Sequence, residues 1–90
     1  MSVTIHLHPD MTCRADDNES VETQGGTVGE CIDHLLSQYP GLYNLIFYKD
    51  GSLQSFLEVY VNREAATPNE LSWPVRDGDE IHLVFTIAGG

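Results

Sequence analysis

Apolar and polar residues alternate near both ends of the chain. Val3, Ile5 and Leu7 are separated by single polar residues, and a period of two predicts a strand with one buried face. Pro9 is expected to end this strand. The segment 80–87 alternates in the same way and predicts a last strand. One of its faces carries Ile81, Leu83, Phe85 and Ile87, and the other carries His82, Val84 and Thr86.

The segment 27–39 has the period of an amphipathic helix. Thr27 and Glu30 have capping-box spacing, in which the Thr27 hydroxyl accepts from the Glu30 N–H and the Glu30 carboxylate from the Thr27 N–H. Pro40-Gly41 is expected to end the helix after about three turns. Cys31 lies beside the apolar face and is interpreted as a small core residue. The apolar positions are Val28, Ile32, Leu35, Leu36 and Tyr39.

The other segments carry weaker patterns. Residues 10–18 predict a polar loop, residues 19–24 a short second strand, and residues 42–48 an apolar connection of unassigned type. Leu71 and Trp73 are expected to cover the edge of the core. Turns are predicted at 49–52, 62–64 and 75–79. The segment 56–61 predicts a strand with Leu57, Val59 and Val61 on one face and Phe56, Glu58 and Tyr60 on the other.

This order of elements favours a single α+β domain spanning residues 1–90. A hairpin, a helix across one sheet face and a last strand beside the first make the β-grasp, or ubiquitin-like, arrangement. We expect a mixed sheet of four to five strands packed on one main helix, with the opposite sheet face open to a partner. The expected buried cluster is Val3, Ile5, Leu7, Ile32, Leu35, Leu36, Val59, Val61, Ile81, Leu83 and Phe85.

Charge narrows the class of partner. The chain has 14 acidic and 4 basic residues, and its net charge near −10 disfavours binding to nucleic acid or to an anionic membrane. The acidity fits a partner with a basic docking surface, simple solubility or a salty cytoplasm, and composition does not separate these. No apolar run approaches the ~18 residues of a membrane-spanning helix.

The N-terminus and the cysteines indicate a cytoplasmic protein. Residues 1–4 have neither the basic region nor the cleavage site of a secretory signal. Cys13 and Cys31 match no metal or redox spacing, so they are expected to be free thiols in a reducing compartment.

The apolar segment 81–87 runs straight into Ala88-Gly89-Gly90. Glycine has no Cβ, so a Gly-Gly end is thin and can lie in a narrow channel of a partner enzyme. Two interpretations stand side by side. One is a reactive α-carboxylate at Gly90 on a flexible tail of about residues 87–90, and the other is an ordinary frayed terminus.

Three motifs resemble the ThiS/MoaD family of ubiquitin-like sulfur carriers. They are Val59-Tyr60-Val61-Asn62, the segment from Val75-Arg76-Asp77-Gly78-Asp79 to Ile81, and the strand that leads to Ala88-Gly89-Gly90. The helix start Thr27-Val28-Gly29-Glu30 is also typical of the family, and the resemblance covers nearly the whole chain. The length of 90 residues and the segment 42–56 are similar to the longer, CysO-type members. Residues 9–24 match less well.

The resemblance implies a carrier and not an enzyme. A ubiquitin-activating-type adenylyltransferase, using ATP and Mg²⁺, would adenylate the Gly90 carboxylate. A sulfurtransferase or cysteine desulfurase would then supply sulfur for a Gly90 thiocarboxylate, which a downstream enzyme consumes. The carrier itself is expected to bind no cofactor. Gly89 and Gly90 form the reacting end, while Tyr60, Val84, Ile87 and Ala88 are expected to contact the partner.

The resemblance leaves the pathway open, since thiamin, molybdenum or tungsten cofactor, cysteine and tRNA-thiolation pathways use similar carriers. It also leaves a second function open, in which Gly90 forms an isopeptide bond to lysines of target proteins. A third interpretation is an interaction domain with an inert tail.

The histidines offer a competing site. His6 and His8 are expected to point outward from the first strand and His82 from the last, so imidazoles on neighbouring strands could bind zinc or nickel. No fixed motif supports such a site. Solvated histidines with no bound metal are therefore the preferred interpretation.

Overall fold

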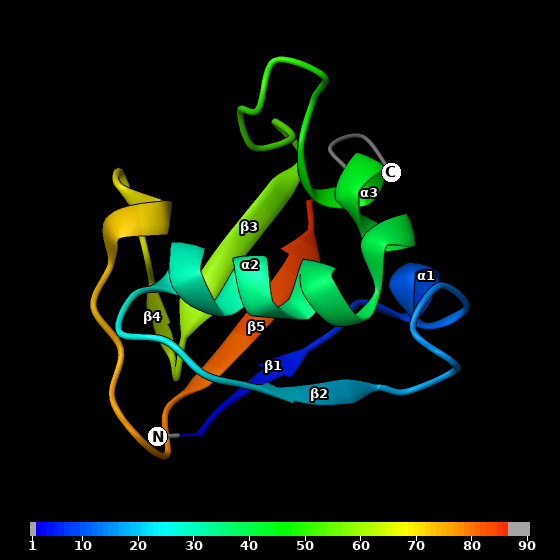
Figure 1. Ribbon diagram of the computed structural model, residues 1–90. Coiled ribbons are helices and arrows are strands. Elements are labelled where there is room, and N and C mark those ends of the chain that lie inside the picture. The colour runs from blue at the N-terminus through cyan, green and yellow to red at the C-terminus, as the bar shows by residue number, and fades with distance from the viewer. Residues whose placement is uncertain (1, 87–90) are drawn as a thin grey trace.

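The computed structural model describes residues 2–86, in which five strands form one mixed sheet (Figure 1). Their spatial order is β2-β1-β5-β3-β4. β1 and β5 pair in parallel, and the other neighbours are antiparallel. The strands are β1 (Val3–His6), β2 (Ser20–Thr23), β3 (Leu57–Val61), β4 (Glu64–Ala65) and β5 (Glu80–Phe85).

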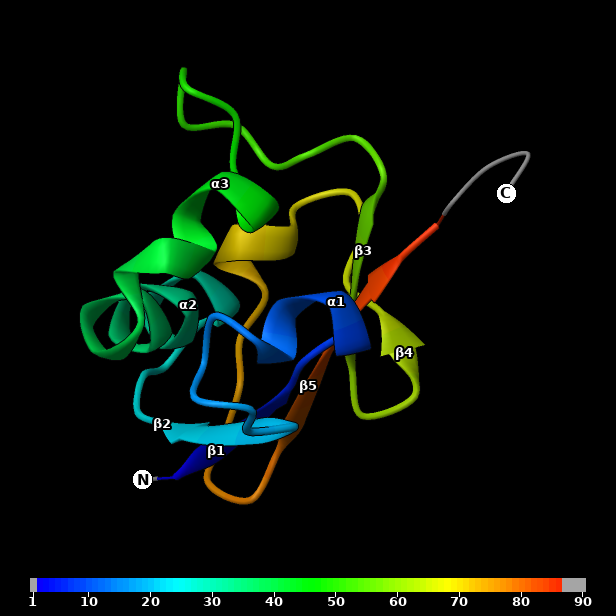
Figure 2. The same cartoon turned by 90° about the vertical axis from the view of Figure 1, so that its right-hand side faces the viewer.

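One helix of 11 residues, α2 (Val28–Gln38), crosses a single face of this sheet (Figure 1). Two short α-helices, α1 (Pro9–Thr12) and α3 (Tyr43–Ile46), and two 3-10 turns, η1 (Pro40–Leu42) and η2 (Glu70–Ser72), complete the described helices. In Figure 2, α2, α3 and η2 lie on the same side of the sheet. The β-grasp predicted from the sequence is therefore confirmed.

The core lies between the sheet and α2. Val3 and Ile5 on β1, Val59 on β3 and Ile81 on β5 belong to one buried cluster with Leu35 of α2, and each is at most 1% exposed. The expected cluster is buried at Leu7, Ile32, Val61 and Leu83 as well. Leu36 and Phe85 are only partly buried and pack against the edge of this cluster.

Residues 10–18, expected to be a polar loop, contain all of α1 except Pro9, and two core side chains. Pro9 occupies the first turn of this helix, and His8 caps it by accepting a hydrogen bond of 3.0 Å at Nδ1 from the Asp10 N–H. Met11 and Ala15 are fully buried. The prediction of a loop was wrong because one helical turn is too short to show a helical period.

The start of α2 follows the predicted capping box with one change. The Thr27 hydroxyl accepts from the Glu30 N–H at 3.2 Å, as expected. The Glu30 carboxylate accepts instead from the Gly26 N–H, at 2.7 Å. Residues 26–28 also pair with residues 73–75, since the Val28 N–H donates to the Trp73 carbonyl. The loop that leads to β5 is therefore tied to the helix start.

Other boundaries differ in detail. β3 begins at Leu57, one residue later than predicted, and β4 was not anticipated. Leu71 is 36% exposed and does not cover the core, whereas Trp73 packs against it. The predicted flexible tail, residues 87–90, lies outside the described residues.

Candidate functional site

The sheet face opposite α2, here named the open face, carries the candidate site. No described helix lies on this face (Figure 2). Because side chains alternate along each strand, the register fixes which residues share it. On the three central strands they are Thr4 and His6 of β1, Glu58 and Tyr60 of β3, and Glu80, His82 and Val84 of β5.

Tyr60 and Val84, predicted to contact a partner, lie on the open face of neighbouring strands. Tyr60 is paired with His82, and Val84 is paired with Glu58. Val84 is 37% exposed, and Tyr60 is partly buried. The alternation of the two strands thus predicted their side of the sheet. Ile87, Ala88, Gly89 and Gly90, the other predicted site residues, lie outside the described part of the chain.

Three aromatic rings gather where β5 ends. The Phe85 ring centroid lies 5.3 Å from that of Phe56 in an edge-on arrangement and 4.6 Å from that of His8. Thr86 follows and donates from its backbone N–H to the Phe56 carbonyl at 2.7 Å. These contacts hold Thr86, the residue that follows β5, against Phe56. The aromatic side chains at residues 56 and 85 were the only sequence signal for this cluster.

A second group on the open face joins His6, Glu80 and His82. Their ligand atoms all lie within 4.8 Å of one another. His8, the third histidine expected here, is not a member, because β1 ends at His6 and His8 turns into the cap of α1. The sequence therefore predicted two members of this cluster and missed Glu80.

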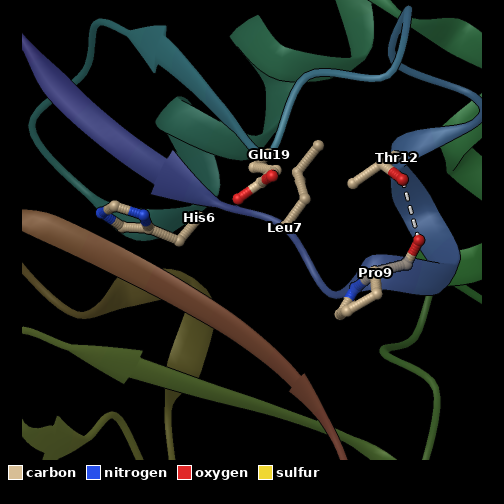
Figure 3. A pocket seen from close by; sticks show the side chains of 5 residues that line it. All are labelled: His6, Leu7, Pro9, Thr12 and Glu19. Atoms are coloured by element: carbon tan, nitrogen blue, oxygen red, sulfur yellow. Dashed lines mark hydrogen bonds between the residues drawn. The ribbon is translucent and has the colours of Figure 1, made fainter.

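A pocket of about 360 Å³ lies between the end of β1 and α1 (Figure 3). It is lined by His6, Leu7, Pro9, Thr12 and Glu19. The Thr12 hydroxyl is bonded to the Pro9 carbonyl, and the His6 ring points away from both residues (Figure 3). His6 instead contacts Glu80 at 2.6 Å. The pocket therefore lacks converging polar side chains, and we assign it no catalytic role.

Cys13 and Cys31, both among the described residues, are free thiols, as the sequence predicts. Cys13 is exposed, and Cys31 is fully buried in the face of α2 that packs on the sheet. Burial raises the pKa of the Cys31 thiol, although a hydrogen bond with Thr23 opposes the shift. Since the thiolate is the reactive form, Cys31 is a core residue and not a nucleophile.

Within residues 2–86, no helix has both the length and the apolar character needed to cross a membrane. The described part of the chain is a β-grasp domain whose open face and central strand β5 lead toward its C-terminal residues. These features define a ubiquitin-like domain in which β5 is the last described strand.

The family model described as "ThiS family" matches residues 9–90, and the chain belongs to this family. The sulfur carrier protein CysO of Mycobacterium tuberculosis is 28% identical over 93 residues, with both chains fully covered.

Two solved structures have the same fold as this chain and are about one third identical to it in sequence. A chain of the Amycolatopsis orientalis BexX/CysO complex is 32% identical and has a TM-score of 0.85, covering 98% of this chain and 99% of that chain. SAMP1 of Haloferax volcanii is 30% identical, has a TM-score of 0.86 and covers both chains fully. The resemblance to longer, CysO-type members is thus confirmed.

Proposed function

We propose that this protein is a sulfur carrier that acts through the α-carboxylate of Gly90. The observation that carries the proposal is the family match, which extends to Gly90 and so includes the Gly-Gly end. The similarity to CysO, named a sulfur carrier, supports the same function. The protein would act as a co-substrate of other enzymes and would not itself be an enzyme.

The chemistry needs activation because a carboxylate oxygen is a poor leaving group at neutral pH. A ubiquitin-activating-type adenylyltransferase would bind ATP and Mg²⁺, and the Gly90 carboxylate would attack the α-phosphate and release pyrophosphate. The terminal sulfur of a persulfide on a sulfurtransferase or cysteine desulfurase would then displace AMP and form an acyl disulfide. A thiol would reduce this S–S bond and leave the Gly90 thiocarboxylate. A downstream enzyme would take this sulfur. The carrier supplies the reacting end, and all nucleotide binding belongs to its partner.

Docking would use the open face beside the C-terminal end of β5. Val84 offers exposed apolar surface there, and Tyr60 lies on the adjacent strand. Ile87 and Ala88 would continue from β5 into the partner's channel. The BexX/CysO complex, in which a similar chain is seen with another protein, supports docking by this fold in general.

Intact-mass analysis tests the proposal directly. The protein is co-expressed with the adenylyltransferase and the sulfur donor of its own organism, and a thiocarboxylate would add about 16 Da at Gly90, because sulfur replaces oxygen. Protein expressed without the adenylyltransferase is the control and should keep the carboxylate mass. An unchanged mass in the presence of the active enzyme would contradict the proposal.

A second candidate function is protein modification. SAMP1, named a small archaeal modifier protein, is similar over 71% of this chain at 36% identity. In that case the adenylated Gly90 would form an isopeptide bond to a lysine of a target. The same co-expression distinguishes the two functions, because conjugates of higher mass with no thiocarboxylate would favour the modifier.

A further inference from the structure

We propose that His6, Glu80 and His82 form a binding site for one divalent transition-metal ion, such as Zn²⁺, on the open face of the sheet. This inference goes beyond the sulfur-carrier function and departs from the sequence-based preference for solvated histidines. Nothing in the proposed carrier chemistry uses these three side chains. The carrier function therefore gives no reason for the two histidines and the glutamate to lie together on the open face.

The backbone brings the three side chains together. His6 on β1 is directly paired with His82 on β5, and neighbouring strands lie about 4.8 Å apart. Glu80 precedes His82 by two residues, so both side chains leave β5 on the same face. Asn62 fixes Glu80 further, since its Oδ1 accepts from the Glu80 N–H at 3.0 Å. The cluster thus follows from strand register and not from flexible loops.

The ligand atoms are near enough for side-chain rotation to bring them to the spacing of a zinc site. Zinc–nitrogen and zinc–oxygen bonds of about 2.0–2.2 Å in a tetrahedron place neighbouring ligand atoms roughly 3.3 Å apart. The ligand atoms of the cluster lie within 4.8 Å of one another. The His6 and His82 rings are stacked, with centroids 4.5 Å apart and planes 7° from parallel. To point their nitrogens at one ion, the two rings must turn out of this stack by rotation about their side-chain bonds.

Exposure allows this adjustment. The side chains of His6 and Glu80 are 38% and 52% exposed, and His82 is partly buried. The hydrogen bond of 2.6 Å between His6 Nε2 and Glu80 Oε1 would open to admit the ion. Such an exposed pair contributes little stability on its own, so its loss opposes binding only weakly.

The ligand set determines the kind of metal. Two imidazoles and one carboxylate suit zinc and other borderline metals better than calcium or magnesium, which prefer oxygen ligands. Three protein ligands leave a fourth position free, as in zinc sites that bind water or another group. An open pocket of about 410 Å³, lined by Asn62, Arg63, Glu80 and His82, adjoins the cluster and gives access to that position. The net charge of −10 also attracts cations.

The test is a calorimetric titration of untagged, chelator-treated full-length protein with ZnCl₂. We expect one ion per chain. His6→Asn and His82→Asn should each weaken binding by at least about tenfold, because loss of even an outer-sphere partner commonly costs 10–100-fold. His34→Asn is the matched control, since His34 lies on α2 and its Nδ1 accepts from the Gln24 N–H, a bond that the asparagine oxygen can replace. It should bind as tightly as the wild type.

A second measurement does not depend on variants. In NMR spectra of the wild-type protein, the ring signals of His6 and His82 should shift with zinc, while those of His34 and His8 should not. Cys13→Ser should leave the affinity unchanged, because the exposed thiol lies outside the cluster. Absence of binding, full affinity in His82→Asn, or loss of affinity in Cys13→Ser would each overturn the proposal. Intact-mass analysis of Gly90 is unaffected by these outcomes, so the carrier function is judged separately.

Discussion

The Tyr60 hydroxyl donates a hydrogen bond of 3.0 Å to Glu58 Oε1, two residues earlier on the same face of β3. The bond to this carboxylate raises the pKa of Tyr60, since the neutral phenol is the donor and Glu58 would repel a phenolate. Glu58 is itself paired with Val84, and Tyr60 with His82. The hydrogen bond therefore links the two β3 residues that lie opposite His82 and Val84 on the open face.

Replacing Glu58 by glutamine should lower the pKa of Tyr60, because the repulsive charge is removed. Tyr48 provides an internal comparison, since hydrogen bonds from the Ser55 side chain and backbone lower its pKa. As the pH rises, Tyr48 should lose its proton before Tyr60 in the wild type. NMR titration of labelled tyrosines measures both. An unchanged Tyr60 in Glu58→Gln, or ionisation of Tyr60 before Tyr48, would contradict this account.

Replacing Leu35 by alanine should destabilise the fold by about 2–5 kcal/mol, because the side chain is fully buried between α2 and the sheet. That is a large fraction of the stability of so small a domain. The free energy of unfolding is measured by urea denaturation. Leu71→Ala is the matched control and should cost clearly less, since Leu71 is 36% exposed. Equal losses would mean that burial does not determine the stability of this core.

Much of the fold could be predicted because its long elements repeat a simple pattern. The alternation in β1, β3 and β5 assigns each residue to a face, and the positions from Val28 to Leu35 define one side of α2. Short elements have no such repeat. Met11 in α1 is buried through contacts with distant parts of the chain, which a local pattern does not contain.

The candidate sites were likewise predictable where a pattern within one strand determines them, and less so where they depend on contacts between segments. The side of the sheet occupied by Tyr60 and Val84 follows from alternation within single strands. Membership of the histidine cluster depends on the pairing of His6 with His82 across a parallel contact, and on the end of β1 before His8. Neither fact can be obtained from one segment alone. Glu80 is different, because the alternation of the predicted last strand alone places it on the same face as His82, and it was missed because only histidines were considered as ligands.

Replacing Val84 by aspartate should weaken docking to the adenylyltransferase while the domain remains folded. A charge on this exposed position would be desolvated in the complex without a partner. The new carboxylate would also face Glu58 across the strand pair, which should cost about 0.2–1 kcal/mol of stability. Pyrophosphate release against carrier concentration measures the effect, and we expect a higher KM.

Two variants test whether added charge alone, or any change at residue 84, would raise the KM. Asn69→Asp adds the same charge at an exposed position beside η2, on the other side of the sheet, and should leave the KM unchanged. Val84→Thr retains the branched shape without a charge and should have an intermediate effect. Wild-type kinetics in Val84→Asp, or an equal defect in Asn69→Asp, would exclude Val84 from the docking surface.

Changing the length of the chain at Gly90 should abolish activation. Deleting Gly90 withdraws the terminal carboxylate by ~3.5 Å, as far as the whole separation of reacting atoms in a near-attack geometry. Adding one glycine moves the carboxylate past that position and converts the Gly90 carboxylate into an amide, which is a far weaker nucleophile. Both variants leave residues 2–86 unchanged, so we expect the same unfolding midpoint.

Adenylate formation with the cognate enzyme is measured by pyrophosphate release and by intact mass. Substituting Gly90 by alanine keeps the carboxylate at its position and adds one methyl group. If Gly90→Ala is still adenylated while both length variants are not, the position of the carboxylate is required and glycine itself is not. Full activity in the deletion variant would show that Gly90 is not the reacting residue.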